Sequence, residues 1–174
     1  MKKFVKSLVS TMLIGSMLFS FAGCSVKFDA VKAKDFKKAL EDAMDIDDDD
    51  YSDYDWDDSR NIWYYHKDIR IDYYQFDDAD DAYDYFEDLY DEWEDTLDDG
   101  DFDGKHKEKF KDDATSGYIL LNGESDNDDF YEGDIYGGIY FVDDIIIIAV
   151  CRSDKQKDMD KIDALLDAIG YSHL

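Results

Sequence analysis

Three aspartates at alternate positions form the most distinctive chemical pattern in the chain, at Asp99, Asp101 and Asp103. A glycine follows the third aspartate, so the segment has the DxDxDG spacing that begins many calcium-binding loops. Calcium takes carboxylate oxygens as ligands, and the glycine permits the sharp turn that brings them together. The glutamate expected at the twelfth position is replaced by Phe110, and 46 acidic residues make a chance match easy. The pattern predicts a calcium site, and the alternative is a polar loop after a helix.

Aromatic side chains among carboxylates form a second candidate site, at Tyr54, Trp56 and Trp63. Aromatic rings combine an apolar face with a negative quadrupole, so such a group can hold a sugar or a cation. The alternative is that these rings pack within a sheet. The acidic segment 47–58 overlaps this group and can attract divalent cations loosely, although a solvated acidic surface explains it equally simply.

A catalytic constellation is not evident in the sequence. The histidines are His66, His106 and His173, and none stands in an HExxH motif. GxSxG, the phosphate-binding GxxxxGK loop and CxxC are also missing from the sequence. Carboxylates are so frequent that no pair can be singled out as acid and base. We therefore expect a protein that is not an enzyme, with a hydrolase as a distant alternative.

The first 24 residues have the layout of an export signal. Lys2, Lys3 and Lys6 precede an apolar stretch over 8–21, which ends in two small residues and Cys24. The apolar stretch is too short for a spanning helix, and no stop-transfer pattern follows it. The sequence therefore predicts secretion.

The end of this signal, Phe21-Ala22-Gly23-Cys24, resembles the lipobox of bacterial lipoproteins, with Phe21 in place of the usual leucine. The resemblance implies cleavage before Cys24 and attachment of diacylglycerol to its sulfur. Each buried methylene contributes about 0.8 kcal/mol, so two or three acyl chains anchor a protein durably. In composition the chain also resembles small, acidic, tyrosine-rich lipoproteins of Gram-positive bacteria, which implies no activity.

Charge and cysteine content limit the kinds of partner that we expect for this protein. The net charge is −27, which opposes nucleic-acid binding. Five lysines between Lys27 and Lys38 are expected either to contact anionic headgroups or to form a solvated helix start. Cys151 has no second cysteine to pair with once Cys24 is acylated, and we expect it to be buried and inert. We expect a monomer on the extracytoplasmic side of the cell membrane, bound to the bilayer through Cys24 and to an unidentified envelope protein or ligand.

Hydrophobic periodicity divides the chain into a signal (1–23), a tether (24–34) and one acidic α+β domain (35–174). Asp77 or Asp78 is expected to cap the second helix, and Asp154 is expected to cap the last helix, which Gly170 ends. The predicted helices cover 34–44, 78–97 and the residues after Asp154, and the predicted strands cover 62–66, 69–76, 105–111, 118–122, 139–142 and 145–151.

This order of elements predicts an antiparallel sheet of about five to six strands, with about three helices packed mainly on one face. Four consecutive isoleucines, Ile145–Ile148, predict a central strand or one covered on both faces. The alternating lysines of 105–111 predict an edge strand protected against pairing, with an anion site as the alternative.

Overall fold

The computed structural model describes residues 29–56, 59–111, 114–127 and 131–174, and it contains three helices and seven strands in those ranges. The predicted site residue Cys24 lies outside them. The elements in chain order are α1 (Ala33–Met44), β1 (Ser52–Asp55), β2 (Arg60–His66), β3 (Ile69–Gln75), α2 (Ala79–Asp98), β4 (Phe102–Lys109), β5 (Ser116–Asn127), β6 (Tyr131–Val142), β7 (Ile145–Cys151) and α3 (Gln156–Ile169).

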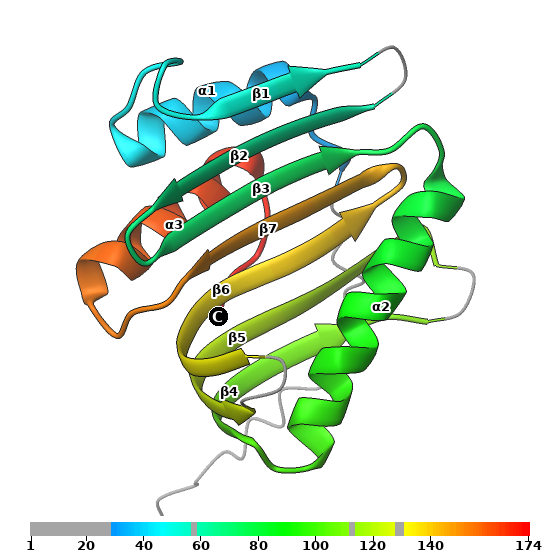
Figure 1. Cartoon of the computed structure of the whole chain (residues 1–174), viewed down its shortest axis with the longest axis vertical. Coiled ribbons are helices and arrows are strands. Elements are labelled where there is room, and N and C mark those ends of the chain that lie inside the picture. Colours follow the sequence, from blue (N-terminus) through cyan, green and yellow to red (C-terminus); the bar gives the residue numbers. More distant parts are fainter. Residues whose placement is uncertain (1–28, 57–58, 112–113, 128–130) are drawn as a thin grey trace, which may run out of the picture.

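The strands form one antiparallel sheet in the order β1-β2-β3-β7-β6-β5-β4. Helices α1 and α3 pack together on one face, and α2 lies on the opposite face (Figure 1). The predicted α+β class and antiparallel sheet are confirmed. The sheet has seven strands in the described ranges rather than five to six, because β1 adds an edge strand that the sequence did not indicate. The helices divide two to one between the faces.

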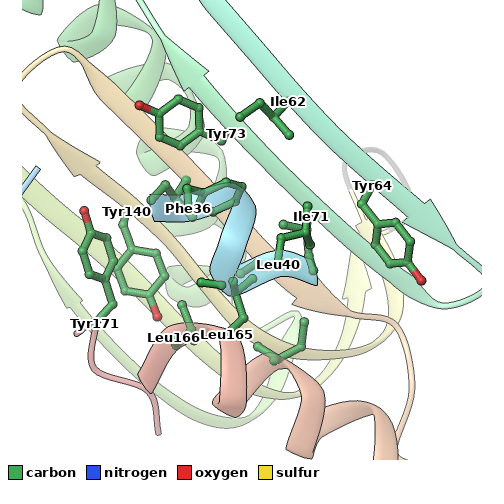
Figure 2. Close-up of a cluster of buried hydrophobic side chains, with 14 of the residues drawn as sticks. Phe36, Leu40, Ile62, Tyr64, Ile71, Tyr73, Tyr140, Leu165, Leu166 and Tyr171 are labelled. Atoms are coloured by element: carbon green, nitrogen blue, oxygen red, sulfur yellow. The ribbon is translucent and has the colours of Figure 1, made fainter. Parts of the chain in front are cut away.

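The first hydrophobic core lies between the sheet and the pair α1 and α3. Figure 2 shows Phe36 and Leu40 of α1 beside Leu165 and Leu166 of α3, over strand residues that include Tyr140. All five of these side chains are buried. Apolar burial on this scale is the main stabilising term for the sheet and for these two short helices.

Tyrosine hydroxyls attach the chain before α1 to the same core. Tyr73 donates a hydrogen bond to the carbonyl of Val31 at 3.1 Å, and Tyr171 donates one to the carbonyl of Asp29 at 3.2 Å. Val31 packs against the core, and Ala33 already belongs to α1. The folded domain therefore begins before residue 35, and 29–34 is not a free tether.

The second core lies under α2, whose Phe86 and Trp93 pack against the sheet. Strand β7 is central, and all of its residues are buried. Its side chains alternate, so that Ile145 and Ile147 enter the first core while Ile146 and Ile148 enter the second. The predicted strand covered on both faces is confirmed.

The structure agrees with the residues predicted at two helix ends and disagrees with the residue predicted at a third. Asp78 caps α2 by accepting hydrogen bonds from the backbone N–H groups of residues 80 and 81, and Gly170 ends α3 at a φ of 77°. Asp154 does not cap α3, so that prediction was wrong. Lys155 holds the cap position, and its N–H donates to the Ser153 hydroxyl at 3.1 Å.

On the face of the sheet that carries α2, strands β1 and β2 have no helix over them among the described residues, because α2 lies mainly across β5, β6 and β7 (Figure 1). Ile62, Tyr64 and Ile71 point into the first core, so their neighbours along the strands point the other way. We call this side of β1–β3 the open face. It presents Tyr54, Asn61, Trp63, Tyr65 and Arg70, and toward β7 it ends at the buried Asp72 and at Tyr74, whose ring lies 5.7 Å from that of Tyr85 on α2.

Candidate functional site

The structure brings the predicted aromatic residues Tyr54, Trp56 and Trp63 together on the open face. The rings of Tyr54 and Trp63 stack with centroids 4.8 Å apart and an interplanar angle of 17°. The rings of Tyr54 and Trp56 stack at 5.8 Å and 22°. Tyr54 therefore joins the two tryptophans in what we call the aromatic stack, and ligand binding by these residues stays a prediction.

The open face also collects exposed apolar surface. Tyr54 is 48 % exposed, Trp56 53 % and Tyr65 57 %. These are three of the four large hydrophobic side chains that are exposed in the described parts of the chain, and the fourth is Leu174. Single exposed aromatics are ordinary, whereas contiguous exposed apolar patches are typical of binding surfaces.

Ion pairs on the reverse side of β1 hold this edge strand in place. The Asp53 carboxylate accepts hydrogen bonds from Arg60 of β2, at 2.9 Å from Nε and 2.7 Å from a terminal nitrogen, and from Lys37 of α1 at 2.8 Å. The fork of Arg60 is the largest cause of the lowered pKa of Asp53. The pairing therefore stabilises the fold above the ordinary carboxyl range and is lost as pH falls through that lowered pKa.

A buried ion pair lies beside the aromatic stack. Asp72 is fully buried opposite Trp63, and its Oδ2 accepts a hydrogen bond from Arg70 Nε at 2.6 Å. The other oxygen, Oδ1, is buried and has no partner of hydrogen-bonding geometry in the described structure. Burial of Arg70 opposes its charge, but the Asp72 carboxylate raises its pKa overall. The guanidinium also lies 5.9 Å from the ring centroid of Tyr65.

Neither Asp72 nor Arg70 was singled out from the sequence as a candidate site residue. Both lie in the predicted strand 69–76, where nothing marked them apart from its other residues. Composition offered one indication, because three of the 19 basic residues are arginines. Arginine is the basic residue suited to buried and forked ion pairs, so these three positions are where such pairs are expected.

The aspartates of the predicted calcium loop occupy three different kinds of structure. Asp99 caps the C-terminus of α2, and Asp103 lies in β4 opposite Glu124. Asp101 lies between them, where its backbone N–H donates to the carbonyl of Thr96 and its carbonyl accepts from Asp126. No group of three acidic, histidine or cysteine side chains able to hold a metal occurs within the described ranges. Calcium binding stays a prediction.

Two further side chains that could react, Cys151 and His173, have structural roles. Cys151 is buried as expected, and burial raises the pKa of its thiol to about 12. His173 lies 3.1 Å from Asp163 and 3.2 Å from Asp167, which attaches the C-terminal segment to α3. The hydroxyl of Tyr136 donates to the same Asp163 at 2.5 Å. These contacts tie the end of the chain to α3.

The lysines of the predicted membrane-contacting segment are partly used within the domain. Lys37 pairs with Asp53, and Lys38 pairs with Asp42 one helical turn away. Lys32 and Lys34 are exposed around the start of α1. The lysine-rich β4 is an edge strand, as predicted. None of the described helices is both long and apolar enough to cross a bilayer.

Comparison with known proteins adds no family to this description. Searches against family models, curated proteins and solved structures found no match to the chain.

Proposed function

We propose that the chain is a lipid-anchored, extracytoplasmic binding protein without enzymatic activity, and that its ligand binds on the open face. The observation that carries the proposal is the aromatic stack, with two of its three rings about half exposed on an uncovered sheet face. An edge strand fixed by a forked arginine pair holds these rings in a defined position. Preorganised aromatic side chains bind ligands at low conformational cost.

A saccharide is the ligand class that these groups fit best. Aromatic rings pack against the C–H faces of sugar rings, and nearby polar side chains bond the hydroxyls. Asn61 is in register with Tyr54, so its amide lies on the same face as the stack. Asp55, at the end of β1, points to the reverse side, where it lies 3.2 Å from Arg60, so the described polar partner beside the stack is Asn61.

The attachment of the chain before α1 also favours this proposal. The Asp29 carbonyl is held by Tyr171, and five residues separate the proposed anchor Cys24 from Asp29. Five residues span at most about 18 Å, so the anchor would keep the domain close to the headgroups. Residues 29–31 lie on the α1 and α3 side of the sheet, away from the open face. Replacing Cys24 with alanine should release the protein from the membrane fraction, and retention of the variant there would contradict the anchor.

Binding is tested with a glycan array probed by the full chain in detergent. We expect selective capture by the native protein and about thirtyfold weaker binding by Trp56→Ala, because truncation of a central aromatic anchor costs about 2 kcal/mol. Leu174→Ala is the matched control. Of the four large exposed hydrophobic side chains of the described residues, it removes the one outside the open face, and it leaves the stack intact. Equal binding by Trp56→Ala, or no captured glycan, would contradict the proposal.

A further inference from the structure

A second recessed site lies between α2 and the sheet, separate from the aromatic stack. Its volume is about 110 Å³. Leu89 and Trp93 of α2 line one side, and Ile148 and Val150 of β7 form the floor. Arg70 and Arg152 complete the lining, and a shallower hollow of about 430 Å³ adjoins the pocket at these two arginines. We call this site the arginine pocket.

The charges at its mouth are unusual for this protein. Lys67, Arg70 and Arg152 line the hollow together with one carboxylate, Asp68. Asp68 also lies 3.4 Å from the ammonium of Lys155, and Asp72 pairs with Arg70. A chain of net charge −27 therefore has a local surplus of positive charge here, formed by two of its three arginines.

Arg152 is the group best placed to receive a ligand. Its guanidinium lies 4.7 Å from the ring centroid of Tyr131, which is a cation–π contact, and no described residue accepts a hydrogen bond from its side chain. It makes no ion pair with any residue the structure describes. Its backbone N–H donates to the carbonyl of Asp68 at 2.6 Å, so the position at the end of β7 is fixed. A planar guanidinium with free donors binds a carboxylate through two parallel hydrogen bonds.

We infer that the arginine pocket binds a small monocarboxylate that carries a short apolar group. The carboxylate lies on the guanidinium of Arg152, and the apolar group enters the cavity between Trp93 and Val150. An apolar cavity of about 150 Å³ holds benzene, so about 110 Å³ suits a branched aliphatic group or most of a phenyl ring. The ring of Trp93 is buried in the second core and supplies a preformed wall. This inference does not depend on saccharide binding at the aromatic stack.

The three tryptophans of the chain make the two sites distinguishable in one spectrum, because Trp56 and Trp63 belong to the stack and Trp93 lines the pocket. The full chain is labelled with fluorotryptophan, placed in lipid nanodiscs and titrated with phenylacetate. We expect the fluorine resonance of Trp93 to shift and those of Trp56 and Trp63 to stay in place. A shift at the stack alone, or no shift at all, would overturn the inference.

Variants and a second probe test each half of the site. Arg152→Met should bind phenylacetate about tenfold to a hundredfold more weakly, since it loses hydrogen bonds to a charged group. Lys157→Met removes the same charge from an exposed position on α3 and should bind like the native chain. Acetate should bind at least about tenfold more weakly than phenylacetate, because it buries no apolar group. Unchanged affinity in Arg152→Met, or equal affinity for acetate and phenylacetate, would refute the assignment.

Discussion

The Arg70–Asp72 pair allows a quantitative test of how the sheet tolerates a buried charge beside the open face. Asp72 has no exposed side-chain surface, whereas the side chain of Arg70 is 37 % exposed. Replacing Arg70 with methionine keeps the aliphatic stem and leaves the carboxylate buried without its cation. Removing one partner of a buried pair costs about 3–5 kcal/mol. Because water reaches part of Arg70, we expect the lower end, about 3 kcal/mol.

The double variant Arg70→Met/Asp72→Leu supplies the matched comparison, because it replaces the whole ion pair with apolar groups. We expect it to be about 2 kcal/mol or more above the single variant in free energy of unfolding, since apolar replacement of buried ion pairs is often neutral or stabilising.

Urea denaturation at pH 7, followed by far-ultraviolet circular dichroism, measures both free energies of unfolding. Equal stability of the single and double variants would refute the reasoning, because the loss in the single variant would then come from packing and not from the buried charge.

Three further predictions follow from buried positions and from the predicted metal loop. Gly137→Ala should lower the free energy of unfolding by about 3 kcal/mol, with about 1–2 kcal/mol from its φ of 134° and about 1–3 kcal/mol from displacing the carbonyl of Ala149. Gly133→Ala, at a φ of 111° with open space around it, should lose only the part that comes from φ. Equal losses for the two variants in urea titrations would contradict this. The Cys151 thiol, with its pKa raised to about 12, should resist alkylation at pH 8 until urea unfolds the domain, and rapid labelling of the native chain would contradict its burial. Asp99, Asp101 and Asp103 lie at a helix end, in a connection and in a strand. The melting temperature should therefore be equal in EDTA and in millimolar calcium at matched ionic strength. A rise in melting temperature that is specific to calcium would restore the loop as a metal site.

Strongly periodic segments of the sequence were enough to predict most elements. The apolar segment Ile145–Cys151 corresponds to β7 at both ends, and the stripe that includes Phe86 and Trp93 predicted α2 to within a residue at each end. The predicted strands 139–142 and 145–151 leave two residues between them, and the first of these, Asp143, adopts a φ of 52° in the turn between β6 and β7. These elements bury their own apolar pattern, so local sequence and tertiary packing agree.

Strands that depend on distant partners could not be predicted in the same way. Strand β1 has the sequence Ser-Asp-Tyr-Asp, which is poor in β-forming residues, and it exists because Asp53 is paired with Arg60 and Lys37. The predicted start of β6 at residue 139 was late, because Gly137 and Gly138 interrupt the apolar pattern. In the folded sheet Gly137 lies so close to the carbonyl of Ala149 that a side chain would collide with it.

The position of α2 on the sheet could not be predicted from hydrophobic periodicity alone. The isoleucines of β7 indicated cover on both faces, yet the order of elements did not say which helix would supply it. The members of the aromatic stack could be proposed together because they are close in sequence. The arginine pocket was missed, because Arg70, Trp93 and Arg152 come from three separate elements that only the sheet order brings together.

The central claim, that the open face binds the ligand, is tested most directly by the fluorine spectrum of the labelled full chain with the saccharide that binds best on the array. We predict that the resonances of Trp56 and Trp63 shift together and saturate at the same concentration, while that of Trp93 does not move. A saccharide that binds and shifts Trp93 alone, or leaves all three resonances unchanged, would contradict the claim.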